Sequence, residues 1–426
     1  MKINDFTIKI NRFGPLENVS FKLAPLMVFT GLSSTGKSYA NYLVYYFLSR
    51  VCNGSLSNLV GEKIASDKDS QKYTFSLDSF LMRLSVNVQN FMQKFLGDDD
   101  LKCDVQFTSS MRKRTFSFQI ERKELEEDEN GMLSQSHTYT LNIEDGQSFQ
   151  QSDFSLLSLF AAYELRRYIL GEGFFRSVIF PPGRGAFAGE NYTFKQDVGS
   201  SLEMYNSFFF DYDYGLRFHG RRGLDTNDDL SRKLLDMTSG GQLLSVEDKQ
   251  YIKIDENHRL ALSASASSVK DLSPWLFYLK NPIGTHIYCL EEPEAHQHPS
   301  VTVQIADTIA VSLNRGNGFH LTTHSDYLLQ RLNQLVKLGG IRKKNEALFK
   351  RICSERHLDE QCYIDAQSVH AYYFSKKKDG KTKVETLKVD DDGIPMKSFF
   401  DVVRDLNDRE EYIADAIYEL SKEQDD

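Results

Sequence analysis

A glycine-rich segment with a lysine and a serine is the first group of residues whose types and spacing could do chemistry. Gly31–Ser38, GLSSTGKS, fits the pattern G-x-x-x-x-G-K-[S/T] and lies between a predicted buried strand and a predicted helix. The glycines let successive backbone N–H groups surround phosphate oxygens at the helix start, where the helix dipole favours negative charge. We expect Lys37 to contact the β- and γ-phosphates and the Ser38 hydroxyl to hold Mg²⁺. The predicted phosphate-binding residues are Gly31, Ser33, Ser34, Thr35, Gly36, Lys37 and Ser38.

Two adjacent carboxylates end an apolar segment later in the chain. The sequence HIYCLEEPE, residues 286–294, predicts a buried strand that ends in Glu291 and Glu292. At the carboxyl end of a strand in an α/β sheet, such groups face the ligand crevice. We expect Glu291 to hold the hydration shell of Mg²⁺ and Glu292 to be the general base for an attacking water. The doublet alone also suits a solvated acidic helix start before Pro293; the phosphate loop and the next motif favour the catalytic interpretation.

A histidine ends another apolar strand about thirty residues further on. The sequence FHLTTHS, residues 319–325, places His324 directly after a predicted strand. A lone histidine is more often a packed or surface group. Here, however, the order of loop, carboxylate pair and histidine matches ATPases in which a histidine reaches the γ-phosphate. The expected catalytic residues are therefore Lys37, Glu292 and His324, and the expected metal ligands are Ser38 and Glu291.

These segments together resemble the ABC-type ATPases outside the transporter group. That group includes SMC proteins, double-strand-break-repair ATPases and the OLD-like ATPases of bacterial phage-defence operons. The resemblance rests on Gly31–Ser38, on LEEPEAHQHP at 290–299 and on TTHSDYLLQRLN at 322–333. The last two are most similar to the OLD-like branch, in which E-E-P-E-x-H-x-H-P and T-T-H-S-x-x-L-L recur.

The resemblance implies both a fold class and an assembly. The fold would be α/β, an ABC-type P-loop ATPase head with a mixed sheet flanked by helices, an antiparallel β N-terminal part and two inserted subregions. Such heads enclose two ATP molecules between two chains, and each head lends a signature serine to the γ-phosphate bound by its partner. The implied cofactors are ATP and Mg²⁺. The implied partner is a second copy of the chain, in a homodimer or higher homo-oligomer that hydrolyses ATP to ADP and phosphate.

Two segments compete for the role of that signature. Ser239–Gln242 has the letters S-G-G-Q, but it lies far upstream of the carboxylate pair and leads into predicted strands. The other, SASSVKD at 265–271, opens the predicted helix that leads directly into the carboxylate-bearing strand. In the family the signature begins the helix immediately before that strand, so the spacing favours Ser267 and Ser268. The departure from the family is Val269, where a glycine is usual.

An arginine precedes the second inserted region. Phe180–Arg184, FPPGR, resembles the segment I-P-x-x-R of OLD-like ATPases. Arg184 could neutralise phosphate charge or pair with the carboxylates Glu291 and Glu292. The alternative is a solitary arginine in a Pro-Gly turn.

Residues 1–426 are expected to form a single ATPase domain with three added regions. These are an α+β insertion at 55–150, a variable arm or lid at 185–250, and a C-terminal hairpin and charged helix at 363–426. No heptad run is evident, so nothing in the sequence suits the long coiled coil of SMC or repair ATPases, which disfavours long-range DNA tethering. A nuclease domain of the TOPRIM type is also disfavoured, because the acidic cluster Asp390–Asp392 has no partner glutamate upstream.

Composition limits the classes of protein that remain. The chain has 426 residues, 40% of them hydrophobic, and a net charge of 51 − 60 = −9. It can therefore build a sizeable core, and its acidity argues against a surface coated with nucleic-acid-binding charge. No stretch approaches the roughly 20 apolar residues that span a membrane. Five scattered cysteines, an odd number without a C-x-x-C pair, suit a reducing cytoplasm.

The sequence thus predicts an ATP hydrolase whose output is a change of conformation or assembly. Its expected role is a nucleotide-driven sensor or scaffold that controls a separate effector protein, plausibly a nuclease, in an anti-phage system. The alternative is a DNA-repair or chromosome-associated ATPase that acts directly on DNA. A third interpretation is a scaffold that binds ATP without hydrolysing it.

Overall fold

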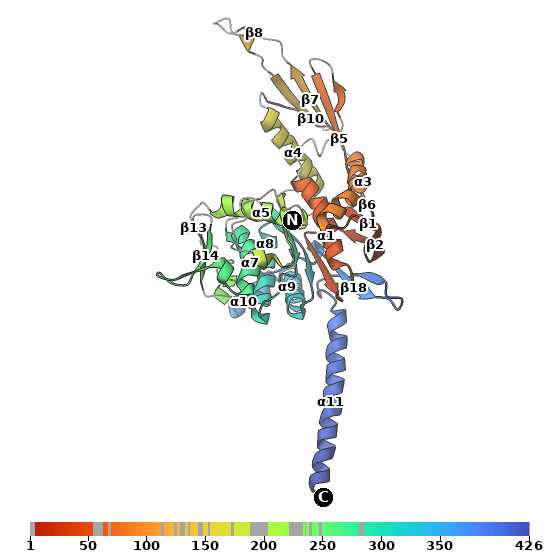
Figure 1. Ribbon diagram of the computed structural model, residues 1–426, viewed down its shortest axis with the longest axis vertical. Helices are drawn as coiled ribbons and strands as arrows, with labels where there is room; N and C mark the ends of the chain where they lie inside the picture. The colour runs from red at the N-terminus through yellow and green to blue at the C-terminus, as the bar shows by residue number, and fades with distance from the viewer. Residues whose placement is uncertain are drawn as a thin grey trace.

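The computed structural model shows a central α/β body from which two extensions project at opposite ends (Figure 1). One extension is a small sheet with its helices, and the other is the long C-terminal helix. No helix in the described ranges is both long and apolar enough to cross a membrane. The described residues are 5–53, 63–66, 70–111, 115–122, 126–127, 133–134, 137–143, 148–151, 154–171, 174–187, 203–220, 233–234, 236–237, 241–246, 249–280 and 285–425.

A six-stranded sheet forms the centre of the body. Its strand order is β12-β16-β17-β3-β18-β19, and every neighbouring pair is parallel except β18 with β19. The bounds are β12 Phe174–Phe180, β16 Thr285–Glu291, β17 Gly318–Thr323, β3 Leu26–Gly31, β18 Val369–Lys376 and β19 Thr382–Leu387. Strands β3, β16 and β17 are buried along almost their whole length, as is typical of parallel strands covered on both faces. Their carboxyl ends meet at one edge of the sheet, which is where the phosphate loop begins.

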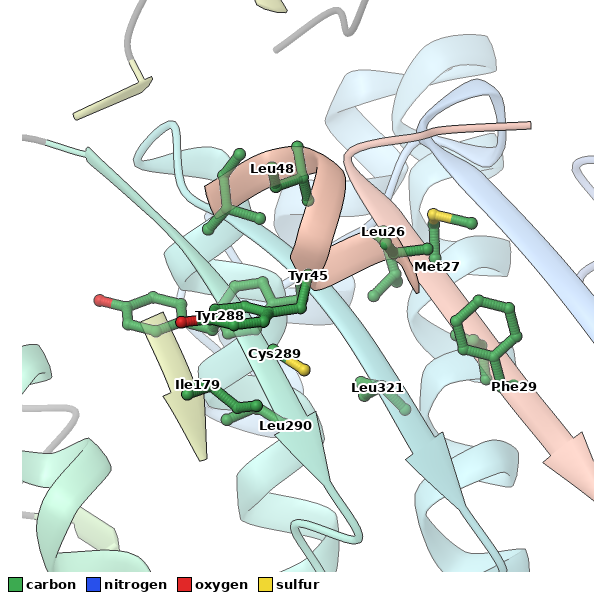
Figure 2. Close-up of a cluster of buried hydrophobic side chains, with 14 of the residues drawn as sticks. Leu26, Met27, Phe29, Tyr45, Leu48, Ile179, Tyr288, Cys289, Leu290 and Leu321 are labelled. Carbon is green, nitrogen blue, oxygen red and sulfur yellow. The ribbon is translucent and has the colours of Figure 1, made fainter. Parts of the chain in front are cut away.

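Helices cover the sheet and position that edge. Helix α1, Lys37–Cys52, starts directly after the loop and is buried along most of its length. Figure 2 shows Tyr45 and Leu48 of α1 beside strand residues such as Leu26 and Tyr288, in the apolar layer that fixes the helix on the sheet. The remaining helices of the body are α7 Ser267–Lys280, α8 Pro299–Asn314, α9 Asp326–Lys344 and α10 Glu346–Arg356.

An antiparallel sheet at the N-terminal side completes the body. It has the order β2-β1-β6, with β1 Phe6–Phe13, β2 Leu16–Lys22 and β6 Cys103–Ser109. Helix α3, Leu77–Leu96, joins this part to α1, because the Tyr46 hydroxyl donates a hydrogen bond to the Leu84 carbonyl at 3.0 Å. The predicted fold class, a mixed sheet flanked by helices with an antiparallel N-terminal part, is confirmed.

The region predicted as an α+β insertion contributes to two sheets. Its strand β6 pairs with β1 of the N-terminal sheet, whereas its other strands form a separate five-stranded sheet of order β11-β10-β7-β5-β4. Figure 1 shows this second sheet in the outer part of the first extension, with helix α4 running from the sheet toward the body. The bounds are β4 Lys63–Ser66, β5 Ser70–Ser76, β7 Thr115–Arg122, β10 His137–Ile143, β11 Ser148–Gln151 and α4 Phe154–Leu170. A two-stranded ribbon, β8 Glu126–Glu127 with β9 Leu133–Ser134, lies between β7 and β10 in the chain.

The region predicted as an arm or lid is described only in part, since residues 188–202 and 221–232 lie outside the described ranges. Its described elements are the 3₁₀ turn η1 Arg184–Phe187, helix α5 Glu203–Gly220, and the strands β13 Gln242–Val246 and β14 Lys249–Lys253. Strand β15, Arg259–Ala261, completes a three-stranded sheet with β13 and β14. At the C-terminus, the β18–β19 hairpin is followed by helix α11, Lys397–Asp425.

Candidate functional site

The glycine-rich segment predicted to bind phosphate forms the turn between β3 and α1. Gly31 and Gly36 have φ values of 119° and 91°, a region of backbone conformation that favours glycine. A Cβ at Gly31 would lie 2.1 Å from the carbonyl oxygen of Phe374, so the loop can approach β18 only with glycine at this position. Gly36 caps α1 without any side-chain hydrogen bond, which leaves the first N–H groups of the helix open to an anion.

The side chains of the loop fall into two groups. Ser33 and Ser34 are exposed, so they are free to face a phosphate. Thr35 is fully buried, and its hydroxyl donates to the Leu32 carbonyl at 2.7 Å. The expectation that Thr35 contacts phosphate therefore applies only to its backbone N–H, because its side-chain hydroxyl is bonded to the Leu32 carbonyl within the loop.

Lys37 is folded back onto the loop. Its Nζ donates to the carbonyls of Leu32 at 2.7 Å and Gly31 at 3.2 Å. Burial lowers the pKa of Lys37 to about 8, and the nearby carboxylates of Glu292 and Glu291 oppose that shift. A phosphate at the loop would supply a stronger acceptor for this ammonium than a neutral carbonyl can.

Glu291 joins the loop to the end of β16. Its Oε2 accepts hydrogen bonds from Ser38 Oγ at 2.6 Å and from Thr322 Oγ1 at 3.0 Å, and its Oε1 accepts one from Asn41 Nδ2 at 2.6 Å. Thr322 lies opposite Glu291 in the parallel register of β16 and β17, which explains this contact. The carboxyl group is 1% exposed, and its burial raises its pKa to about 7.

The paired oxygens of Ser38 and Glu291 suit a small divalent cation. Hydroxyl and carboxylate oxygens are the ligands that Mg²⁺ prefers, and Mg²⁺ usually takes its remaining ligands from water and substrate phosphates. A cation beside Glu291 would also keep this buried carboxyl group ionised. The donor set therefore fits the metal that the sequence predicts.

Asn41 and His320 form a second layer behind Glu291. The Asn41 amide donates to Glu291 through Nδ2, so its Oδ1 is left to accept from His320 Nδ1 at 2.6 Å. His320 therefore carries its proton on Nδ1. Its ring is buried, and burial lowers the pKa of His320 to about 3, so the imidazole is neutral. Sequence reasoning missed both residues; the available signal was the position of Asn41 one helical turn after Lys37.

Glu292 and His324 lie together at the exposed side of the site. His324 Nε2 is 3.5 Å from Glu292 Oε1, and both side chains are partly exposed. Glu292 has φ 44°, a left-handed conformation that is unusual for a glutamate and is held by a hydrogen bond from its N–H to Thr322 Oγ1 at 3.2 Å. Burial and the charge of Lys37 lower the pKa of His324, while Glu292 raises it. The three residues predicted to be catalytic thus lie within electrostatic reach of one another.

Glu294 fixes the segment that carries His324. Its Oε1 accepts from Thr323 Oγ1 at 2.6 Å and from the backbone N–H groups of His324 at 2.9 Å and Ser325 at 3.1 Å. Its carboxyl group is buried, which raises its pKa. Sequence reasoning assigned it no role, although it is the third carboxylate of the E-E-P-E segment.

Arg184 is buried and donates hydrogen bonds to backbone carbonyls, a contact that neither sequence prediction included. It is 3% exposed and donates to backbone carbonyls, from Nη1 to Glu291 at 2.7 Å and from Nε to Asp271 at 2.8 Å. It therefore donates its hydrogen bonds to backbone carbonyls, Glu291 included, while its charge interacts electrostatically with the carboxylates of Glu291 and Glu292. Through these hydrogen bonds Arg184, in η1, connects α7 to the end of β16. The Asp271 side chain adds two contacts, because it accepts a hydrogen bond from the N–H of Gly185 and contacts His296.

The preferred signature segment does open a helix. Helix α7 begins at Ser267, which is exposed, and Ser268 is half-buried. Ala266 precedes them, and its carbonyl accepts from Val269 N and Lys270 N. Because alanine has no side-chain acceptor, the first N–H groups of α7 are not capped by the preceding residue. In the competing segment, residues 239–240 lie outside the described ranges, and Gln242 begins strand β13 instead of a helix.

Solved structures of SMC heads are similar to this chain, at low sequence identity. No protein-family model and no curated protein matches the chain. Among solved structures, an SMC head bound to the C-terminal winged-helix domain of ScpA is 13% identical, with TM-score 0.38, and covers 91% of this chain and 98% of its own. The SMC head domain from Thermotoga maritima is 10% identical, with TM-score 0.34, and covers 91% and 100%.

A third solved structure is an SMC head with an extended coiled coil, bound to the C-terminal domain of ScpA and derived from Pyrococcus furiosus. It is 13% identical, with TM-score 0.36, and covers 91% of this chain and 96% of its own. Since all three TM-scores are low, the fold is assigned from the chain's own strand order and loop geometry. The chain has an α/β fold in which helices flank a mixed sheet and the glycine-rich segment joins β3 to α1.

Proposed function

We propose that the chain binds ATP with Mg²⁺ and hydrolyses it to ADP and phosphate. The observation that carries the proposal is the contact between Ser38 and Glu291 at 2.6 Å, which joins the phosphate loop to the carboxylate strand. Lys37, Glu292 and His324 surround the same point. A loop for phosphates, a pair of metal ligands and a candidate base therefore converge at one edge of the sheet.

Each side chain has a distinct role in this proposal. Lys37 leaves the loop carbonyls to bind the β- and γ-phosphates, and the open N–H groups of α1 hold the phosphate oxygens. Glu292 accepts a proton from the attacking water, and His324 donates a hydrogen bond toward the γ-phosphate. Mg²⁺, when bound with ATP, neutralises phosphate charge next to Ser38 and Glu291.

Hydrolysis would require a second copy of the chain. The exposed start of α7, with Ser267 and Ser268, offers a hydroxyl and uncapped N–H groups to a γ-phosphate held by a partner. Gln297 Nε2 donates to the Ser268 carbonyl at 2.8 Å, so α7 is tied to the segment that follows Glu292. This tie supports a mechanism in which closure of two heads and readiness for hydrolysis are coupled.

The biological output we propose is control of a separate effector protein, a nuclease in an anti-phage system. This part rests on the motifs at 290–299 and 322–333, which resemble the OLD-like branch. Copurification of the untagged products of neighbouring genes, with and without ATP, is its test. Salt-dependent binding of duplex DNA by the isolated chain, without any copurifying protein, would instead favour direct action on DNA.

Two substitutions test the ATPase proposal. Lys37→Ala should reduce ATP affinity at least about tenfold, because the phosphates lose their cation. Glu292→Gln should keep ATP affinity and lower the rate of phosphate release about 100-fold or more, because the base is lost. Binding titrations and single-turnover phosphate release measure the two effects separately. Phosphate release by Glu292→Gln at the wild-type rate would exclude Glu292 as the base.

A further inference from the structure

Helix α11 carries an apolar stripe that no part of the described chain covers. Figure 1 shows the helix leaving the body and extending alone to the C-terminus. Every side chain from Arg404 to Tyr418 is exposed, and Leu406, Ile413 and Ile417 expose 56%, 51% and 62% of their surface. Most helices in proteins are stable because an amphipathic face packs on something else. A 29-residue helix with this stripe therefore requires a partner.

The stripe has the spacing of a two-helix seam. Its positions follow one another in alternating steps of four and three residues, which keeps them on one side of a supercoiled helix. The seam positions are Phe399, Val403, Leu406, Glu410, Ile413, Ile417 and Leu420. Only Glu410, near the middle, is not apolar. The expectation that the chain has no heptad run is wrong for this segment, which is short and otherwise strongly charged.

The charge on α11 is unevenly distributed, and this limits the partners that fit. Residues 397–409 hold three basic and three acidic side chains, a net charge of 3 − 3 = 0. Residues 410–425 hold one basic and six acidic side chains, a net charge of 1 − 6 = −5. An anionic lipid surface would repel the second half. Two parallel copies would bring both acidic halves together and set Glu410 against Glu410, whereas antiparallel copies place each acidic half beside a neutral one.

We propose that α11 pairs with α11 of a second copy of the chain in antiparallel orientation, with Leu406 level with Ile417 of the second copy. At this register Glu410 meets Ile413, and positions 403 and 420 of the two copies lie level with each other, so the seam of one copy faces the seam of the other. Arg409, beside the seam, comes about 6 Å along the axis from Glu410 of the second copy, within reach of its long side chain. The seam is thus self-complementary, as a two-fold symmetric contact must be.

The pairing requires no nucleotide, so its test is independent of the proposed ATPase activity. Sedimentation of the full-length chain without ATP should give the mass of two chains at micromolar concentration. Ile413→Asp places a charge in the seam and should lower the mass to that of one chain. Tyr412→Asp is the matched control, because Tyr412 is the adjacent residue, 79% exposed and off the seam; it should keep the two-chain mass.

Disulfide crosslinking tests the orientation. The five native cysteines are buried, so they do not compete under mild oxidation. In the proposed register two copies of position 406 lie about 16 Å apart, so Leu406→Cys alone should not crosslink. A mixture of Leu406→Cys and Ile417→Cys chains should crosslink to each other. Self-crosslinking of Leu406→Cys would overturn the antiparallel pairing, and a wild-type chain that stays monomeric at every concentration would overturn self-pairing and leave the seam to a different protein.

Discussion

At the scale of single residues, Asn41 is the side chain whose removal tells most about the metal site. It holds Glu291 Oε1 and His320 Nδ1 at 2.6 Å each, so Asn41→Ala leaves two buried groups without this partner. We expect at least about tenfold more Mg²⁺ to be needed for half-maximal ATPase activity, the usual effect of losing a residue that orients a metal ligand.

The Mg²⁺ dependence separates this positioning role from a merely structural one. Ser49→Ala is a suitable control, because Ser49 lies on the same helix and its hydroxyl bonds only to the Tyr46 carbonyl within that helix. Lower thermal stability with an unchanged Mg²⁺ requirement in Asn41→Ala would show that Asn41 supports packing alone.

His320 predicts a particular response of stability to acid. Its pKa is about 3 in the folded chain against a usual value of about 6.5, so the unfolded chain binds the extra proton between these values. Stability from this group is therefore present above pH 6.5 and lost as the pH falls toward 3, by about 2 kcal/mol at pH 5. His320→Asn keeps an N–H donor toward Asn41 but cannot be protonated.

The comparison of the two chains isolates the histidine from other titrating groups. The raised pKa values of Glu291 and Asp211 act in the opposite direction, but they are present in both chains. The loss in free energy of unfolding between pH 7.5 and pH 5 should be smaller in His320→Asn than in wild type. Equal losses, measured by urea unfolding, would show that His320 is not the acid-sensitive group.

Sequence patterns predicted the residues that converge at the carboxyl edge of the sheet better than the buried residues behind them. Lys37, Ser38 and Glu291 belong to motifs whose spacing is dictated by phosphate and metal geometry, and the structure brings them together. Asn41 and His320 are ordinary polar residues in a helix and a strand, and their role exists only because β17 lies beside β16 under α1. Such pairing across almost 280 residues leaves no local pattern in a single sequence.

At the scale of elements, hydrophobic periodicity predicted the individual helices and strands but not their partners. Residues 55–150 were expected to form one insertion, yet strand β6 of this region pairs with β1 of the N-terminal sheet. Alternation of apolar and polar residues shows that a strand has one buried face; it does not show which edge the strand joins. Helix α11 was likewise predicted as a charged element, and only the structure shows that Leu406, Ile413 and Ile417 of its apolar stripe are exposed.

The two signature candidates give the prediction that belongs to this scale. Ser268→Arg should leave the ATP affinity of one head nearly intact, since Ser268 lies at the start of α7 and outside the phosphate loop. It should lower the rate of cooperative ATP hydrolysis at least about tenfold, because the arginine side chain blocks access to the γ-phosphate bound by the partner. Ser239→Arg is the matched control and should cost only local stability. Loss of turnover in Ser239→Arg with a silent Ser268→Arg would reverse the assignment.

At the scale of the whole molecule, the two proposed contacts, one through the nucleotide surface and one through α11, cannot both be made with the same second copy of the chain. The 29 residues of α11 span about 43 Å, so antiparallel pairing places two heads at opposite ends of the helix pair. Closure of two heads on ATP, in contrast, requires the heads to face each other directly. A chain that uses both contacts must therefore join two different copies, and closed dimers become linked into larger assemblies.

The mass of the assembly in four conditions tests this combination. Glu292→Gln chains with ATP should form particles of four or more chains, because ATP-bound heads stay closed while α11 links the pairs. Without ATP the same chains should stop at two, held by α11 alone. Adding Ile413→Asp should give two chains with ATP, held by the heads, and one chain without it. Light scattering on these samples separates the contacts, because Ile413→Asp removes the contact through α11 and the omission of ATP removes the contact between the heads. If Ile413→Asp chains with ATP still exceed two copies, the links between closed dimers come from another surface and not from α11.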